Sequence, residues 1–107
     1  MKQISSNEFT SEVLESPIPV IADFFTEYCG PCRSLSPLLE EAETSRSGTL
    51  KVVKIDASAE SDLAAAFRVT TMPTVILFQG GEPVAQFVGG RSKSELERWI
   101  EDSLRRQ

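Results

Sequence analysis

Two cysteines, Cys29 and Cys32, are the side chains of this chain best suited to covalent chemistry. They are the only cysteines among 107 residues, and two residues separate them. A pair with this spacing can close and open a disulfide, and beside an alternating strand and helix pattern it is typical of a redox site. We therefore expect thiol–disulfide exchange at this turn of the chain.

The positions of the two cysteines predict different roles for their sulfur atoms. Cys29 stands at the exposed start of the turn, whereas Cys32 falls in the first turn of the helix that follows. The free amides and the dipole of a helix N-terminus stabilise an anion, so Cys29 is expected to be the attacking thiolate. Cys32 is then the shielded thiol that resolves the mixed disulfide. Pro31 restricts the backbone between them. No adjacent cation is required to stabilise the thiolate, although Arg33 is close in sequence and could help.

Other uses of the cysteine pair are weaker or stay open. A structural crosslink across so short a loop contributes about 2 kcal/mol at best. A structural zinc ion takes four ligands, and the chain has two cysteines and no histidine, so no metal site is expected within one chain. A metal or iron–sulfur site shared by two chains stays open, as do an oxidant or isomerase and a binding or chaperone-like subunit that needs no thiol chemistry.

Charge and length narrow the class of protein. The formal net charge is -5, which is unsuited to nucleic-acid phosphates or an anionic membrane surface, so neither partner is expected. No apolar run is long enough to span a bilayer, and the residues from Met1 to Ser6 lack the apolar core of a signal peptide. We therefore expect a cytoplasmic protein, with residues 1–107 forming a single domain.

The elements that must position the cysteines are a strand before them and a helix after them. The near-continuous apolar run Val20–Phe25 is typical of a strand that is buried on both faces of a parallel sheet. From Leu35 to Ala42, apolar residues recur at helical spacing. Pro37 lies inside that helix and predicts a kink, because proline lacks the amide hydrogen and crowds the preceding turn.

The rest of the chain continues this alternation of strands and helices. Before the cysteines we expect a short first strand over Lys2–Ile4 and a helix that begins with a Ser5 and Glu8 capping box and stops before Pro17. After them we expect a strand over Leu50–Ile55, a helix over Ser58–Phe67 with Ser58 as its N-cap, and antiparallel strands over 74–78 and 84–88 joined by Gly80 and Gly81. The closing helix is expected to begin with a Ser92 and Glu95 capping box, to place Trp99 in the core, and to carry Arg105 and Arg106 at its end.

The sequence Tyr28-Cys29-Gly30-Pro31-Cys32 resembles the active-site motif of the thioredoxin family, which usually has tryptophan before the first cysteine. The resemblance extends over nearly the whole chain. It implies an α/β protein with the thioredoxin fold, a central mixed five-stranded sheet flanked by four helices. It also implies a monomeric protein-disulfide reductase without a cofactor of its own, recharged by a thioredoxin reductase with NADPH as the usual electron source.

The resemblance also implies roles for Asp23 and Lys54. A buried carboxylate is costly, so Asp23 in an apolar strand must be paired, hydrated or partly protonated, and the sequence alone leaves open whether it only organises the turn. The family match implies that Asp23 exchanges a proton with Cys32 through a water molecule, with Lys54 as the partner of the carboxylate. Without that match, Lys54 reads as an ordinary strand lysine that faces solvent.

A substrate-docking surface follows from the same resemblance. It implies that the bond between Met72 and Pro73 is cis, so that the backbone of Met72 can pair with an extended substrate as an added strand. We define the docking surface as Tyr28, Gly30, Pro31, Met72, Val88 and Gly89. The alternative places Met72 and Val88 in the core. Phe25 and Tyr28 stand where many members of the family have tryptophan.

Overall fold

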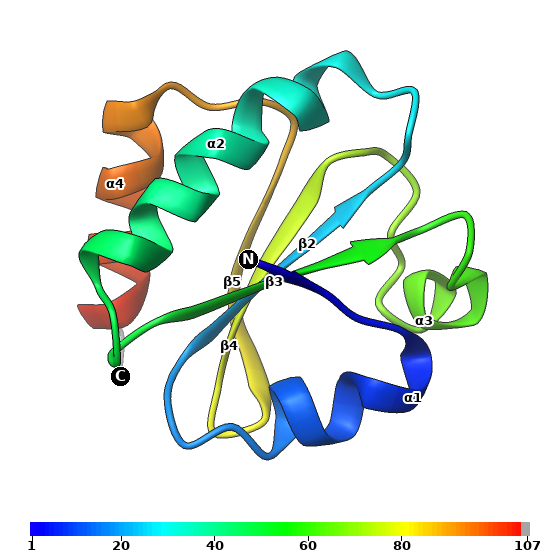
Figure 1. The fold of residues 1–107 in the computed structure, drawn as a ribbon, viewed down its shortest axis with the longest axis horizontal. Coiled ribbons are helices and arrows are strands. Elements are labelled where there is room, and N and C mark those ends of the chain that lie inside the picture. Colours follow the sequence, from blue (N-terminus) through cyan, green and yellow to red (C-terminus); the bar gives the residue numbers. More distant parts are fainter. Residues whose placement is uncertain (106–107) are drawn as a thin grey trace.

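The computed structural model describes residues 1–105, in which helices cover both faces of a five-stranded sheet (Figure 1). The elements are β1 (Lys2–Gln3), α1 (Ser6–Phe9), a π-helical turn η1 (Thr10–Leu14), β2 (Val20–Phe25), α2 (Gly30–Ser45), β3 (Lys51–Asp56), α3 (Ser61–Ala66), β4 (Thr74–Gln79), β5 (Glu82–Val88) and α4 (Lys93–Arg105). Within residues 1–105, none of the helices has the length and apolar character needed to cross a membrane.

The sheet has the strand order β1-β3-β2-β4-β5 and is mixed, as predicted. β2 lies in the middle, parallel to β3 on one side and antiparallel to β4 on the other. β1 extends the parallel half beside β3, and β5 pairs with β4 as the antiparallel hairpin expected from Gly80 and Gly81. The cysteines therefore follow the C-terminal end of the central strand of the sheet.

Alternation along β2 divides its side chains between two cores. Ala22 packs in one core with residues of α1, η1 and α3, whereas Ile21 packs in the other with residues of α2 and α4. Figure 1 shows α2 and α4 on one side of the sheet and α1 and α3 on the other. Because strand side chains repeat with a period of two, Asp23 and Phe25 follow Ile21 onto the face that α2 covers.

The first helical segment has two parts rather than the single regular helix predicted before Pro17. The Glu15 N–H donates to the carbonyl of Thr10 at 2.9 Å, five residues back, which widens the last turn. At the start of α1, the Ser5 N–H donates to the carboxylate of Glu8 at 3.0 Å, the capping contact that the sequence predicted.

The prediction that Ser58 caps a helix over Ser58–Phe67 was wrong, because α3 begins only at Ser61. The Asp56 carboxylate accepts the N–H and the hydroxyl of Ser58 at 3.0 and 2.7 Å, and the N–H of Ala59 at 3.3 Å. Aspartate commonly makes such turns, in which its side chain replaces a main-chain acceptor. The turn ends β3 and uses the hydroxyl that was expected to cap the helix.

α3 ends in a Schellman motif with Arg68 in the left-handed region. The Val69 N–H donates to the carbonyl of Ala64 at 2.9 Å, and the Arg68 N–H donates to the carbonyl of Ala65 at 3.0 Å. The φ angle of Arg68 is 57°, at a position where glycine is the most frequent residue. A side chain at this position strains the backbone.

α4 begins as predicted, but Trp99 is not fully in the core. The Ser92 N–H donates to the Glu95 carboxylate at 2.9 Å, and the Glu95 N–H donates to the Ser92 hydroxyl at 3.2 Å, which completes a capping box. Trp99 is only partly buried and packs edge-on against Phe87, with 4.8 Å between ring centroids. Arg106, expected at the end of this helix, lies outside the described residues.

Candidate active site

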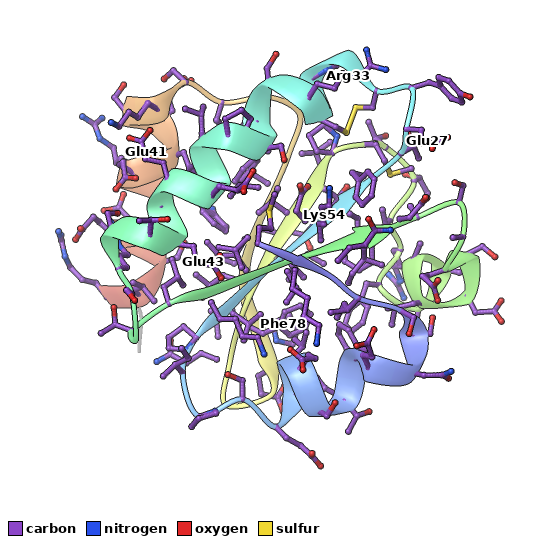
Figure 2. All side chains as sticks on the ribbon, viewed as in Figure 1. Glu27, Arg33, Glu41, Glu43, Lys54 and Phe78 are labelled. Carbon is purple, nitrogen blue, oxygen red and sulfur yellow. A yellow bond between two sulfur atoms is a disulfide. The ribbon has the colours of Figure 1, made fainter. Side chains whose placement is uncertain are left out.

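A disulfide joins Cys29 to Cys32 at the N-terminal end of α2, with their Cα atoms 5.2 Å apart (Figure 2). Cys29 is the N-cap of this helix, and its backbone is extended. Its Sγ accepts the backbone N–H of Cys32 at 3.1 Å, as the side chain of an N-cap residue does. Pro31 fits at the start of the helix because an amide in the first turn has no intrahelical partner. The sequence therefore aims a free amide of α2 at the sulfur of Cys29.

Access from solvent distinguishes the two sulfurs. Cys29 is partly exposed, whereas Cys32 is 5% exposed and packs beneath the start of α2. Tyr28, the residue before Cys29, is 90% exposed. A partner can therefore approach Cys29 from solvent but is hindered at Cys32, which is the arrangement that an attacking and a resolving thiol require.

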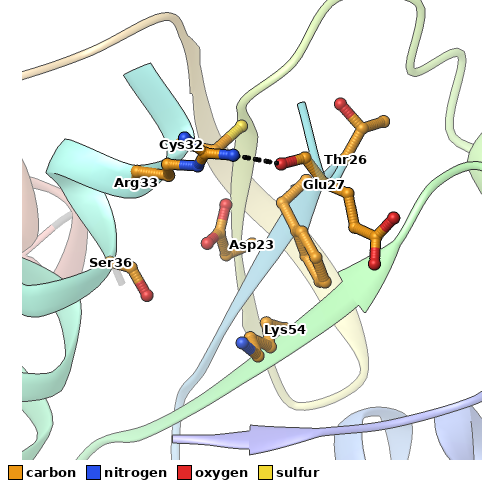
Figure 3. Close-up of a pocket in the computed structure, with 8 residues that line it drawn as sticks. Asp23, Thr26, Glu27, Cys32, Arg33, Ser36 and Lys54 are labelled. Atoms are coloured by element: carbon orange, nitrogen blue, oxygen red, sulfur yellow. Dashed lines mark hydrogen bonds between the residues drawn. The ribbon is translucent and has the colours of Figure 1, made fainter. Parts of the chain in front are cut away.

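Asp23 lies beneath the cysteines and is nearly inaccessible to solvent. It is 2% exposed, and its Oδ1 has no hydrogen-bond partner within residues 1–105. A cavity of about 160 Å³ is lined by Asp23, Cys32 and Lys54 (Figure 3). This volume can hold water, which needs a polar site and room for at least one molecule. The carboxyl group and the shielded sulfur therefore share one polar cavity.

Burial raises the pKa of Asp23 to about 7, and the positive charge of Lys54 opposes part of that rise. Burial disfavours the charged form of a carboxyl group, whereas a cation favours it. A group that is close to half protonated at neutral pH can both accept and donate a proton. Asp23 therefore has the protonation behaviour that proton exchange with a neighbouring thiol needs.

Lys54 stands directly opposite Asp23 in the register of β2 and β3. It is half-buried at the cavity and does not simply point into solvent. Within residues 1–105 no ion pair joins it to Asp23, and its Nζ lies 5.0 Å from the centroid of the Phe25 ring. Lys54 thus acts on Asp23 through its charge without a direct contact.

Arg33 is the second cation at the cavity, and its guanidinium group contacts the backbone. Its Nη2 donates to the backbone carbonyl of Glu27 at 3.2 Å, the contact that is dashed in Figure 3. This contact ties the first turn of α2 to the loop that follows β2.

The loop before β4 and the end of β5 meet beside the cysteines. The Met72–Pro73 bond is cis, as the family resemblance implied. The carbonyl of Pro73 accepts the Gly89 N–H at 2.9 Å. Val88 is 45% exposed and does not belong to the core, whereas Met72 is partly buried against the core beneath α1 and α3. The structure thus joins Pro73, the neighbour of Met72, to Gly89 of the expected docking surface.

Sequence reasoning missed two residues that shape this region, Gly90 and Arg91. A Cβ atom on Gly90 would lie 3.9 Å from the Cβ of Pro31, so the loop after β5 passes close to the cysteine turn. The Nη1 of Arg91 donates to the carbonyls of Val88 and Gly90 at 3.2 and 2.8 Å. The neighbouring glycines Gly89 and Gly90 were a sequence signal for a loop without side chains. No sequence signal indicated that Arg91 would contact main-chain oxygens.

Comparison with known proteins gives a consistent result. The family model described as Thioredoxin matches residues 1–102. The thioredoxin of Mycobacterium tuberculosis is 39% identical over 100 residues, which cover 94% of this chain and 86% of that protein. The thioredoxin of Rickettsia felis is 34% identical over 101 residues, covering 94% and 96%. A bifunctional thioredoxin reductase/thioredoxin of Mycobacterium leprae is 39% identical over 100 residues, which are 94% of this chain but 22% of that longer protein.

Proposed function

Because the chain belongs to the thioredoxin family and is a dithiol–disulfide oxidoreductase, we propose that Cys29 is its nucleophile and Cys32 its resolving thiol. The observation that carries this assignment is the contact of the Cys29 Sγ with the free Cys32 N–H at the start of α2. The greater exposure of Cys29 supports the same order of events.

The reaction begins with the reduced protein and a protein disulfide. The Cys29 thiolate attacks one substrate sulfur, the substrate disulfide breaks, and the other substrate sulfur leaves as a thiolate that takes up a proton. The Cys32 thiolate then attacks the Cys29 sulfur of the mixed disulfide. That step closes the bridge seen in the structure and releases the second substrate thiolate. The dithiol loses two electrons, and the substrate disulfide gains them.

Asp23 is proposed to take the proton of Cys32 in the resolving step and to return it when the disulfide is reduced again. The cavity that the two residues share supports this role, since it has room for a water molecule that relays the proton. A pKa of about 7 suits a group that must both accept and donate at neutral pH. The charge of Lys54 keeps part of the carboxyl group ionised.

The docking surface is proposed to hold an extended segment of a disulfide-containing protein. Tyr28 and Val88 are the large hydrophobic side chains most exposed within residues 1–105. Gly30 and Gly89, near these residues in the sequence, add no side chains to the surface. The backbone of Met72 offers hydrogen-bonding groups to an added strand. Since exposure of large apolar side chains within residues 1–105 is confined to Tyr28 and Val88, we propose that the protein acts as a monomer of one domain over residues 1–107.

A thioredoxin reductase is proposed to recharge the dithiol, with NADPH as the electron source. Members of the family are generally reduced in this way, and the name of the related Mycobacterium leprae protein combines the two activities. The cytoplasm is proposed as its compartment, because a single adjacent cysteine pair suits a catalytic dithiol where thiols are kept reduced.

The test is reduction of a protein disulfide with dithiothreitol or a thioredoxin reductase as electron source. Cys29→Ser should lose the activity, whereas Cys32→Ser should accumulate a mixed disulfide with the substrate, seen by mass spectrometry. Ser34→Ala, an exposed change in the same helical turn, serves as the matched control. Undiminished activity of Cys29→Ser would overturn the assignment. Equilibration with glutathione buffers gives the reduction potential, which separates a reductant from an oxidant.

A further inference from the structure

Three side chains on one face of the sheet set the surroundings of the Asp23 carboxyl group. Asp23 and Phe25 are two residues apart in β2, so both point toward α2, and Lys54 stands opposite Asp23 in the adjacent strand β3. Lys54 can therefore turn toward the carboxylate directly across from it or toward the ring diagonal to it. Its Nζ lies over the ring of Phe25, 5.0 Å from the centroid.

We propose that Phe25 is a positioning residue whose ring holds the Lys54 ammonium group away from Asp23. A cation within about 6 Å of an aromatic centroid is attracted by the negative face of the ring, and the attraction increases when the pair is partly desolvated. Lys54 is half-buried at the cavity, so this condition is met. The position of Lys54 and its effect on the pKa of Asp23 do not depend on the proposed proton exchange. Only the consequence for the reaction rests on that proposed role of Asp23.

Among the groups that face Asp23, Lys54 is the one whose position can change the pKa of the carboxyl group. From α2 come Cys32, which is in the disulfide, and Arg33, whose guanidinium donates to the Glu27 carbonyl at 3.2 Å. The loop after β2 contributes Glu27, a second acid at the cavity. On β4, the residue in register with Asp23 is apolar. Lys54 is thus the cation whose side chain can either approach the carboxylate or lie away from it.

The unpartnered carboxylate fits this arrangement. Oδ1 of Asp23 has no hydrogen-bond partner within residues 1–105, as expected if the ammonium group opposite it is held elsewhere. The pKa of Asp23 is raised to about 7 by burial, and Lys54 offsets only part of the rise. An opposite charge in close contact lowers the pKa of a carboxyl group by about 1 to 3 units. Phe25 therefore preserves a proton acceptor that a nearer cation would weaken.

The experiment is an NMR titration of the Asp23 carboxyl carbon in the oxidised protein. Phe25→Leu removes the ring, and release of Lys54 should lower the pKa of Asp23 by about one unit. Phe25→Trp is the conservative variant and should leave the pKa near the parent value, because tryptophan binds a cation at least as well as phenylalanine.

Repeating the substitution in a Lys54→Met background separates cation positioning from a change in burial. If the ring acts through Lys54, Phe25→Leu should no longer lower the pKa of Asp23 in that background. An unchanged pKa in the single variant, or the same shift in both backgrounds, would overturn the proposal.

A measurement on the parent protein needs no variant to fold. The ε-methylene protons of Lys54 lie close to the ring and should resonate upfield of those of an exposed lysine such as Lys93, owing to the ring current. Ordinary shifts would contradict the contact itself.

The titration involves no turnover, so it is independent of the reductase assignment. If the pKa moves with Phe25→Leu while the pH dependence of mixed-disulfide resolution does not, the role of Asp23 fails and that of Phe25 stands.

Discussion

The backbone N–H of Gly89 donates to the carbonyl of Pro73 at 2.9 Å, which joins the end of β5 to the loop before β4. Gly89 has a φ of 90°, in the region that side chains disfavour. Gly89→Ala should therefore strain this junction and disturb the docking surface. We expect KM for a protein disulfide to rise several-fold, with a stability loss of about 1 to 2 kcal/mol.

Gly48→Ala is the matched control for that substitution. Gly48 also has a positive φ, 83°, and a Cβ atom there meets nothing within 4 Å, as at Gly89. It lies in the loop between α2 and β3, at the opposite end of α2 from the cysteines. The two variants should lose similar stability in a denaturant titration, while only Gly89→Ala changes KM. Equal KM values would show that Gly89 has no part in docking.

The difference in access between Cys29 and Cys32 predicts selective alkylation of the reduced protein. Cys29 is partly exposed and caps α2, whereas Cys32 is 5% exposed. Iodoacetamide at pH 7 should modify Cys29 at least about ten times faster than Cys32, since the thiolate is the reactive form and needs access. Peptide mapping after a short reaction gives the ratio. Preferential labelling of Cys32 would reverse the two roles.

The buried Asp23 predicts a loss of stability as the pH rises. Its pKa is raised from 3.8 to about 7 in the folded protein, so between these values the folded state holds a proton that the unfolded state has lost. The contribution of Asp23 is therefore most favourable below pH 4 and declines until about pH 7. At 1.36 kcal/mol per unit, a difference of about three units corresponds to roughly 4 kcal/mol.

Asp23→Asn removes this titration and keeps the volume of the side chain. The stability of the variant relative to the parent, from urea unfolding of the oxidised proteins, should increase between pH 5 and pH 8. Several surface acids, among them Glu12 and Asp56, have lowered pKa values and add an opposite slope at low pH in both proteins. The comparison cancels that slope. A difference that does not vary with pH would contradict the raised pKa of Asp23.

The left-handed backbone at Arg68 offers a stabilising substitution. Its φ of 57° suits glycine, and its guanidinium makes no ion pair within residues 1–105. Arg68→Gly should raise the stability by about 0.5 to 1 kcal/mol, because relief of strain exceeds the added entropy of the unfolded chain. Arg68→Val should lower it, since a branched side chain fits this region poorly. Denaturant midpoints measure both, and a less stable glycine variant would contradict the strain.

Most of the framework could be predicted because local signals agreed with the tertiary structure. The apolar run over Val20–Phe25 and the two-glycine turn gave the sheet, and the cysteine spacing gave the disulfide. Ser58 shows why a boundary was missed, because its hydroxyl had two possible uses and the nearby Asp56 decided between them. The π-helical turn at Thr10–Leu14 had no sequence signal that separates it from an α-helix.

The site was predicted in its residues but not in its contacts. The family resemblance implied that Asp23 and Lys54 lie near Cys32, and the shared cavity and the register of β2 and β3 agree with that placement. Whether the Lys54 ammonium group lies near the carboxylate or over the Phe25 ring depends on the exact position of its side chain. A pattern of residue types does not predict that position. The same holds for Arg91, whose acceptors are main-chain oxygens.

The two outer strands of the sheet, β1 and β5, limit where another polypeptide can pair with the sheet. β1 pairs over two residues only, and β5 carries Pro83, which has no amide hydrogen to offer, beside a register shift at Leu77 and Phe78. Both margins are therefore poor templates for lateral growth of the sheet by another polypeptide. Aggregation through open edges is therefore discouraged, and the proposed pairing of a substrate segment with the backbone of Met72 does not depend on either margin.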